Sequence, residues 1–394
     1  MTKDAQQIPF NRPYLTGREL SYIAEAHQNG QLSGDGVFTK HCQEWLELLG
    51  VNSSALLTHS CTAALEMAAI LVDIQPGDEV IMPSYTFVST ANAFVLRGAV
   101  PVFVDIRMDT LNINEKLIEK EITSKTKAIV VVHYAGVACE MDYIMDLANT
   151  YGLFVIEDAA QACMSTYKGR KLGTIGHLGC FSFHETKNII SGEGGALMIN
   201  SQNLLDRAEI VREKGTNRKK YLRGHVDKYT WTDIGSSFLP GEIIAAFLWA
   251  QIQESELITK KRLEIWNNYD KSLSGKSKKF TTGKIMPTCS HNAHMYFLVI
   301  QNGFLREKIL NNLKNVGIQC VFHYVPLHSS PFGRKVIKHN YFLPITDYVS
   351  ANIFRLPLWI GLSLDQQEKI IKAVSNEFYI KDAFSNQFMV EMIH

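Results

Sequence analysis

The segment CFSFHETKNIISGEGGALMIN, residues 180–200, places one lysine in a polar turn between two short apolar runs. The runs, residues 180–183 and 196–199, are typical of β-strands, and the glycines before the second run allow a tight return. A lysine held between strands of a large core is desolvated, so it can lose its proton and become a nucleophilic amine. Lys187 is therefore our candidate Schiff-base lysine, although the segment by itself also fits a hairpin with an exposed lysine.

Composition places the chain among globular proteins of balanced charge. Its 394 residues are 46% hydrophobic, and 40 basic against 39 acidic residues leave a formal net charge of +1. This length allows two domains, which we expect at 1–255 and 256–394. The balanced charge argues against nucleic-acid binding. We expect no membrane insertion and a cytoplasmic location, because no apolar run approaches the ~18 residues of a membrane helix.

Short apolar strands alternate with helical patterns before the lysine segment. The strands are residues 55–57, 79–82, 102–104, 128–132 and 154–156, and the helices begin near 62, 90 and 141. Strands this uniformly apolar are buried on both faces, which predicts an α/β fold with a mostly parallel sheet. Beyond a long helical pattern at 241–269, a strand at 294–300 and helices at 305–316 and 365–378 predict a smaller α/β unit.

Polar residues follow several strands at the sheet edge where parallel strands end. Residues 60–62 open a helix after the first strand, and free backbone N–H groups there form an anion site, most often for phosphate. Phe87 follows the second strand, where a ring can face a planar ligand. A buried carboxylate at Asp158 requires a positive partner, such as a pyridinium nitrogen. Each feature also fits a structural role, as an N-cap, a core aromatic or a buried acid.

Competing motifs do not match. Residues 173–179 only loosely resemble a dinucleotide-binding loop, and they lead into a strand instead of a helix. The sequence contains no Walker A, G-x-S-x-G or H-E-x-x-H pattern. His291 and His294 have no further ligands nearby in sequence, so we interpret them as ordinary polar residues and expect no metal. The seven cysteines are odd in number and never spaced C-x-x-C, which argues against a disulfide framework.

Four motifs, in this order and spacing, resemble the DegT/StrS family of PLP-dependent nucleotide-sugar aminotransferases. They are residues 60–62, 83–90, 157–161 and 183–187. The resemblance spans nearly the whole chain and includes residues 323–328 and 355–358. It implies the aspartate aminotransferase fold (PLP fold type I), with a large mostly parallel sheet domain and a smaller C-terminal α/β domain. It also implies pyridoxal 5′-phosphate (PLP) as cofactor and a homodimer.

The resemblance further implies roles for individual residues. Lys187 would bind the cofactor covalently and later move a proton between cofactor and sugar, and Asp158 would keep the pyridine nitrogen protonated. The other implied contacts are Phe87 stacked on the ring, Gln161 near its hydroxyl, Cys61, Thr62 and Ser182 on the phosphate, and His323 and Tyr324 in the sugar-nucleotide pocket. Ser237 would contact the partner subunit's phosphate. Many members have Asn at position 237 and Arg at position 239, where this chain has Ser237 and Leu239.

Residues 34–36, 133–141 and 235–238 resemble the family members that aminate C4 of dTDP-4-keto-6-deoxy-D-glucose. The implied product is dTDP-4-amino-4,6-dideoxy-D-galactose, with L-glutamate as amino donor, in enterobacterial common antigen and surface polysaccharide biosynthesis. Amination at C3 and the gluco epimer remain open. Two rivals share the fold. One is a PMP-dependent sugar dehydratase, which typically has His at the lysine position, with His184 nearby here, and the other is a non-catalytic PLP-binding regulator.

Overall fold

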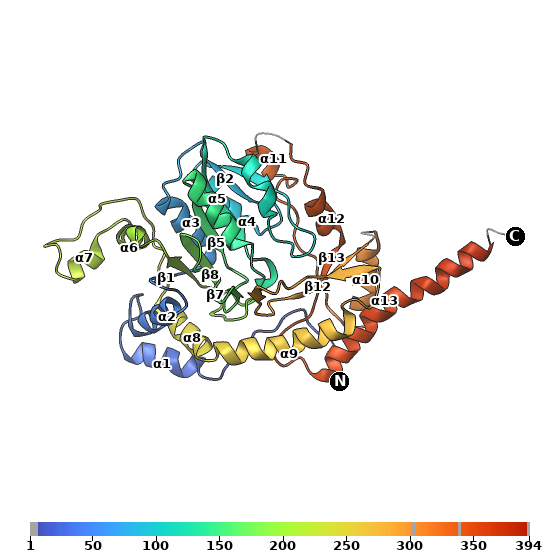
Figure 1. Ribbon diagram of the computed structural model, residues 1–394. Helices are drawn as coiled ribbons and strands as arrows, with labels where there is room; N and C mark the ends of the chain where they lie inside the picture. Colours follow the sequence, from blue (N-terminus) through green and yellow to red (C-terminus); the bar gives the residue numbers. More distant parts are fainter. Residues whose placement is uncertain (1–6, 302–303, 338–339, 392–394) are drawn as a thin grey trace.

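A large twisted sheet forms the centre of the molecule in this computed structural model, which describes residues 7–301, 304–337 and 340–391 (Figure 1). Within these residues the sheet has seven strands, in the spatial order β1 (Ser54–Thr58), β9 (Gly195–Ile199), β8 (Leu178–Ser182), β5 (Phe154–Asp158), β4 (Thr126–Val132), β2 (Glu79–Pro83) and β3 (Val100–Val104). The strands from β8 to β3 pair in parallel. Strand β9 runs antiparallel to both β8 and β1. The predicted α/β fold with a mostly parallel sheet is confirmed.

Helices cover both faces of this sheet because its side chains alternate between two apolar clusters. Ile129 and Val155 lie in one cluster, and their chain neighbours Val130 and Ile156 lie in the other. The first face packs against α1 (Glu19–Gln28), α2 (Val37–Glu47), α5 (Met141–Tyr151) and α8 (Glu242–Gln253). The second face packs against α3 (Cys61–Leu71), α4 (Val88–Val95) and α6 (Leu205–Arg212). This double covering explains why the strands read as continuous apolar runs.

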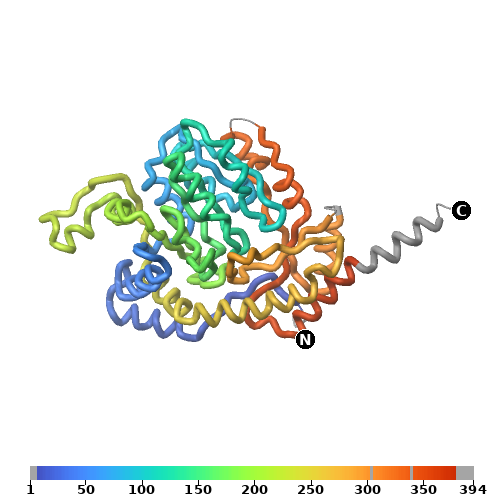
Figure 2. Tube along the Cα trace, in the orientation of Figure 1, coloured from blue at the N-terminus to red at the C-terminus, as the bar shows by residue number. Residues whose placement is uncertain are grey.

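A smaller antiparallel sheet lies beside the large one, in the C-terminal part of the chain (Figure 2). Its strands are β10 (Phe280–Thr282), β12 (Tyr296–Ile300) and β13 (Ile353–Leu356). It shares an apolar core with α9 (Ser255–Leu273), α10 (Phe304–Asn315) and α13 (Leu364–Glu391). The other α-helices of the described residues are α7 (Arg218–Leu222), α11 (Gly333–Val336) and α12 (Pro344–Asn352). The other strands form a small sheet of β6 (Thr166–Tyr167), β7 (Arg170–Lys171) and β11 (Cys289–Ser290). In the described ranges, no helix combines the length and the apolar character needed to cross a membrane.

The C-terminal third departs most from the sequence prediction. The helical pattern at 241–269 forms two helices, α8 and α9, separated by Glu254, whose φ of −104° and ψ of 10° interrupt the helix. Apolar periodicity continues across so short a break, so the pattern alone did not reveal it. The structure also contains α12 and β13, which were not predicted. Strand β13 has only four residues, one of them Arg355, and so has little of the apolar alternation that identifies a strand.

Candidate active site

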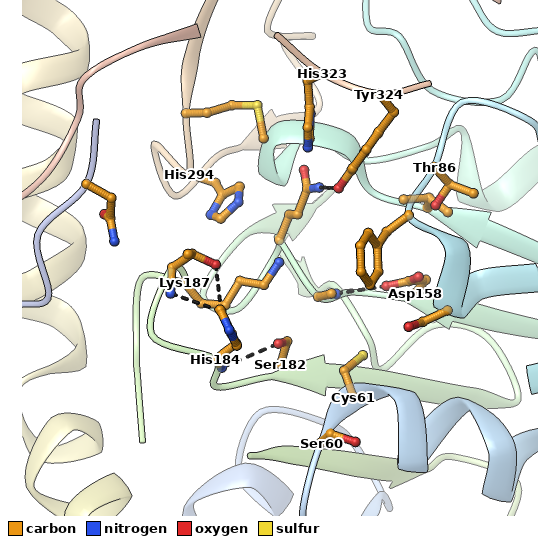
Figure 3. Close-up of a pocket in the computed structure, with 18 of the residues that line it drawn as sticks. Ser60, Cys61, Thr86, Asp158, Ser182, His184, Lys187, His294, His323 and Tyr324 are labelled. Carbon is orange, nitrogen blue, oxygen red and sulfur yellow. Dashed lines mark hydrogen bonds between the residues drawn. The ribbon is translucent and has the colours of Figure 1, made fainter. Parts of the chain in front are cut away.

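A cavity of about 580 Å³ lies at the carboxyl ends of the parallel strands, where the two sheets meet (Figure 3). The chain segments that follow β1, β2, β5 and β8 all contribute to its walls, and β12 and β13 approach it from the other side. Its lining includes the predicted site residues Cys61, Thr62, Phe87, Asp158, Gln161, Ser182, Lys187, His323 and Tyr324. Ser237 is exposed and does not line this cavity. The tertiary structure thus brings together residues from across the sequence.

The start of α3 presents free hydrogen-bond donors at one end of the cavity. The Ser60 side chain accepts a hydrogen bond from the Ala63 amide at 3.1 Å, which leaves the amides of Cys61 and Thr62 without an acceptor in the described structure. The Ser182 hydroxyl accepts from the His184 amide at 3.4 Å, so its own proton can be donated to a ligand. Two free amides, a hydroxyl and the positive end of the helix fit a phosphate group.

Gly195 on β9 allows the sheet to approach this helix start. A Cβ atom at Gly195 would lie 2.4 Å from the Cys61 nitrogen and 2.5 Å from the Ser60 carbonyl oxygen. Real Cβ atoms do not come so close to backbone atoms. A glycine is therefore required for the observed distance between β9 and the turn at Ser60 and Cys61.

Asp158 ends β5 as a buried carboxyl group. Its Oδ2 accepts a hydrogen bond from the Thr90 hydroxyl at 2.7 Å, and its Oδ1 accepts from the Ala160 amide at 3.2 Å. Burial raises the pKa of Asp158, whereas these two hydrogen bonds and the nearby charge of Lys187 lower it. The described residues place no basic side chain in an ion pair with it. A buried acid with only neutral hydrogen-bond donors fits a protonated pyridine nitrogen as its missing partner.

Lys187 lies in the turn between β8 and β9, and its side chain extends into the cavity (Figure 3). Backbone hydrogen bonds fix this turn, from Glu185 to the Gly192 carbonyl and from Lys187 to the His184 carbonyl, both at 2.9 Å. Burial lowers the pKa of the Lys187 ammonium, the charges of Cys61 and Asp158 raise it, and the charge of Arg355 lowers it further. The turn therefore presents an amine that loses its proton more readily than an ordinary lysine.

One wall of the cavity is polar and contains Gln161, Tyr324 and His323. The Gln161 side chain accepts from the Ala135 amide at 2.7 Å and donates to the Tyr324 hydroxyl at 3.0 Å. Phe87 stands at the rim with 56% of its surface exposed, and its ring centroid lies 6.4 Å from that of Tyr324. An exposed aromatic ring at the edge of a cavity can cover a planar ligand.

Comparison with known proteins identifies the family to which this chain belongs. The model of the DegT/DnrJ/EryC1/StrS aminotransferase family matches residues 13–375. The chain belongs to this family.

Two relatives and one solved structure of another protein illustrate the similarity. The chain is 37% identical to the protein MJ1066 of Methanocaldococcus jannaschii, covering 95% of this chain and 98% of that protein. It is 32% identical to GDP-perosamine synthase of Escherichia coli O157:H7, covering 94% and 98%. The PLP-form of Spr1654 from Streptococcus pneumoniae superposes with a TM-score of 0.86 at 25% identity, over 94% and 98% of the two chains. The chain is thus a PLP-dependent sugar aminotransferase of PLP fold type I.

The aminotransferase site also contains residues that the sequence analysis did not assign. Thr90, in the first turn of α4, contacts Asp158. Arg355 and His294 line the cavity, and His294 had been interpreted as an ordinary polar residue. Its Nδ1 lies 3.0 Å from Oδ1 of Asn188, the residue after Lys187, and burial holds the pKa of His294 well below its usual range. Two of these residues lie in segments that the resemblance already included, Thr90 in 83–90 and Arg355 in 355–358.

A second buried acid, Glu157, holds a backbone turn next to the cavity. Its Oε1 accepts from the amides of Ile175 and Gly176 at 2.6 Å, and its Oε2 accepts from the Gly173 amide and from Nε2 of His133, both at 2.8 Å. The two carboxylates that end β5 therefore differ in function. Glu157 holds the turn before β8, while the neighbouring Asp158 faces the cavity.

Proposed function

We propose that this aminotransferase transfers the amino group of L-glutamate to C4 of dTDP-4-keto-6-deoxy-D-glucose. The products are 2-oxoglutarate and dTDP-4-amino-4,6-dideoxy-D-galactose, so the amino and keto groups are exchanged between the two substrates. The proposed chemistry rests on one observation, which is that Lys187, Asp158 and the start of α3 all line the same cavity. The choice of sugar is supported by the resemblance of residues 34–36, 133–141 and 235–238 to the C4-aminating members.

Each proposed catalytic role follows from a contact in the cavity. When bound, PLP supplies an electron sink for a carbanion. Asp158 would hold positive charge at the ring nitrogen, because its buried carboxylate forms no ion pair with a basic side chain in the described part of the chain. Lys187 attaches the cofactor at rest and, once released, moves the proton at the reacting carbon. Its lowered pKa favours the neutral amine that both steps need.

The remaining predicted residues hold the cofactor and sugar. Cys61, Thr62 and Ser182 bind the phosphate through the donors described above, Phe87 covers the ring and Gln161 lies at its hydroxyl. His323 and Tyr324 belong to the sugar-nucleotide side of the cavity. Tyr134 fixes the His323 ring, because its hydroxyl lies 2.9 Å from Nδ1.

We further propose a homodimer in the cytoplasm that acts in enterobacterial common antigen synthesis. The position of Ser237 supports a dimer. Ser237 does not line the cavity of its own subunit, and it lies on the surface, where it could contact the phosphate bound by the partner subunit. Trp231, which is 80% exposed, and Ile234, which is 44% exposed, lie nearby in the chain and offer an apolar surface for contact. The proposed division into domains 1–255 and 256–394 is supported by the helix break at Glu254.

A GDP-linked 4-keto-6-deoxy sugar is a second candidate substrate. The relative named GDP-perosamine synthase favours it, because 32% identity extends over nearly its whole length. The cofactor-binding residues do not separate the two candidates, since the nucleotide lies on the far side of the sugar from C4.

The test is an NMR assignment of the product made by the purified holoenzyme. The enzyme is incubated with L-glutamate and either dTDP-4-keto-6-deoxy-D-glucose or the GDP-linked 4-keto-6-deoxy sugar. A dTDP-linked sugar with an axial amine at C4 is expected. A 3-amino sugar, the equatorial gluco epimer, or turnover of the GDP-linked sugar alone would contradict the proposed substrate.

A further inference from the structure

His294, in the segment before β12, has one ring nitrogen that makes no hydrogen bond within the described structure. Its Nδ1 lies 3.0 Å from Oδ1 of Asn188, whereas its Nε2 has no partner among the described residues. His294 and Lys187 both line the cavity, as Figure 3 shows. The free nitrogen of His294 is therefore available to a ligand.

The hydrogen bonds of Asn188 decide which nitrogen of His294 carries the proton. The Nδ2 of Asn188 donates to the Asn292 carbonyl at 2.7 Å, so the Oδ1 of Asn188 is the atom that faces the His294 ring. An amide oxygen only accepts hydrogen bonds, and the Nδ1 of His294 must therefore carry a proton and donate it. In a neutral imidazole this leaves a lone pair on Nε2.

The backbone of His294 is held as firmly as its ring. The His294 amide donates to Oδ1 of Asn292 at 3.1 Å, and the His294 carbonyl accepts from Nη2 of Arg262 at 2.8 Å. Asn292 is anchored in turn, because its Nδ2 donates to the Gln161 carbonyl at 2.9 Å. The direction of the Nε2 lone pair is thus set before a ligand binds, which lowers the entropic cost of binding.

A neutral imidazole of this kind accepts a hydrogen bond and does not attract an anion. Burial lowers the pKa of His294 well below its usual range, so Nε2 stays unprotonated at neutral pH. Two other acceptors of the cavity are already engaged, since Gln161 accepts from the Ala135 amide and Asp158 accepts from the Thr90 hydroxyl. A lone pair repels the oxygens of a carboxylate or phosphate, and the hydroxyl groups of a sugar are the donors that fit it.

We propose that Nε2 of His294 accepts a hydrogen bond from the sugar hydroxyl next to the reacting carbon, and that Asn188 is its positioning residue. This inference rests on the proposed transamination at C4. The hydroxyl is then the one at C3, because the other neighbour of C4 carries the ring oxygen and the methyl group. The reacting carbon lies at the amine of Lys187, and the His294 ring is bonded to Asn188, the next residue in the chain. His294 thereby selects sugars that keep this hydroxyl over 3-deoxy sugars.

The test compares the wild-type holoenzyme with His294→Asn on two substrates, dTDP-4-keto-6-deoxy-D-glucose and its 3-deoxy analogue. Asparagine keeps a donor near the position of Nδ1 but has no acceptor at the position of Nε2. We expect wild type to prefer the 3-hydroxy sugar about tenfold or more in kcat/KM, because a site built to bind a hydroxyl rejects the analogue that lacks it. In His294→Asn the preference should fall to within about threefold.

The half reaction with L-glutamate serves as an internal control. It converts the PLP form without sugar, and the cofactor absorbance follows its rate. Since no sugar hydroxyl takes part, the rate in His294→Asn should stay within about threefold of wild type, the size of a minor packing effect. A purely structural role for His294 would slow both half reactions and leave the preference between the two sugars unchanged.

Matched variants define the role further. His294→Gln places an amide oxygen near the position of Nε2 and should restore part of the preference for the 3-hydroxy sugar. Asn188→Leu removes the acceptor that fixes the ring, so it should reduce the preference about threefold or more. His291→Asn is the control, because His291 lies three residues earlier, accepts from the Ala293 amide at 3.2 Å and does not line this cavity. It should leave the preference unchanged.

Three results would overturn the inference. The first needs no variant and is a wild-type enzyme that uses the two sugars equally well. The second is a wild-type preference retained in His294→Asn or, if that variant does not hold PLP, a preference in His294→Gln that exceeds that of wild type. The third is a larger loss in the glutamate half reaction than in the sugar half reaction, which would assign His294 to the amino donor.

Failure of the proposed function gives a different result. Amination at C3, or turnover of the GDP-linked sugar alone, would contradict the proposed substrate but not the role of His294. The comparison then uses the sugar that the enzyme accepts and its analogue without the hydroxyl next to the aminated carbon. Equal use of that pair by wild type would overturn the role of His294 as well.

Discussion

The hydroxyl of Thr90 donates a 2.7 Å hydrogen bond to Oδ2 of Asp158, which connects the first turn of α4 to the end of β5. A carboxylate only accepts hydrogen bonds, so the Thr90 oxygen is left to accept from the Thr86 hydroxyl, 2.8 Å away. This chain of hydroxyl groups stabilises the charged form of Asp158 against the effect of burial.

Thr90→Val should therefore weaken the aminotransferase without unfolding it. Valine has nearly the same shape but no hydroxyl, and a hydrogen bond to a charged group contributes about 1.5–3 kcal/mol. We expect kcat to fall about tenfold or more, while Thr90→Ser restores most of it. Steady-state kinetics and a thermal unfolding curve measured together check this. A Val variant with kcat within twofold of wild type would show that Asp158 does not depend on Thr90.

Asp158→Asn should lower the rate far more than cofactor affinity. The amide keeps the size of the side chain but carries no negative charge for the ring nitrogen, and lost electrostatic stabilisation of this kind costs about 10²–10³ in rate. The measurements are kcat and PLP titration. Asp105→Asn is the matched control, because the buried Asp105 accepts from the Thr346 amide at 2.8 Å outside the cavity. It should lower stability and spare kcat per folded enzyme.

Lys187→Ala should abolish covalent retention of PLP. After incubation with PLP and reduction with borohydride, the intact mass of the wild-type chain should increase by one pyridoxyl phosphate, and that of the variant should not. Lys168→Ala is the control, since Lys168 lies on the surface and pairs with Asp142 at 2.7 Å. A stoichiometric adduct in the Lys187 variant would assign the attachment to another residue.

Gly195→Ala should disrupt the turn at Ser60 and Cys61, which we propose binds the cofactor phosphate. The added Cβ would overlap the Cys61 nitrogen, and such overpacking typically costs about 1–3 kcal/mol. We expect PLP affinity to fall at least tenfold, in addition to the loss of stability. Gly192→Ala provides the contrast, because Gly192 has a φ of +80° and open space around it. Backbone strain there costs about 1–2 kcal/mol but should leave the phosphate contacts intact. Apo-protein unfolding and PLP titration separate the two effects, and equal PLP affinities in both variants would argue against the phosphate site.

His294 should make the protein sensitive to acid. Burial lowers its pKa in the folded state, so below about pH 6.5 the unfolded chain binds a proton that the folded chain does not. The free energy of unfolding therefore falls as pH drops, by up to about 1.4 kcal/mol per pH unit for this one proton. In His294→Gln, urea unfolding of the apo-protein should show a shallower fall between about pH 6.5 and 5, with parallel curves above about pH 7.5. Identical slopes below pH 6.5 would contradict this contribution.

The sequence by itself determined the α/β class, the parallel core and the family. Strands such as residues 128–132 are buried on both faces and are therefore continuously apolar. Such a run can be recognised from the sequence alone. The motifs around Asp158 and Lys187 are short and contiguous, and each lies at the end of a strand. Their position at the sheet edge could therefore be predicted from the order of strands and helices.

Only the tertiary structure decided which distant residues complete the cavity. Phe10 and Arg355 lie at opposite ends of the chain, and their contact depends on how the N-terminal segment packs on the smaller sheet. The support that Thr90 gives to Asp158 depends on the distance between α4 and β5, which no local pattern specifies. Sequence periodicity records which side chains are buried within one element, whereas contacts between elements arise when the whole core packs. For this reason the environment of Arg355 could be known only from the tertiary structure.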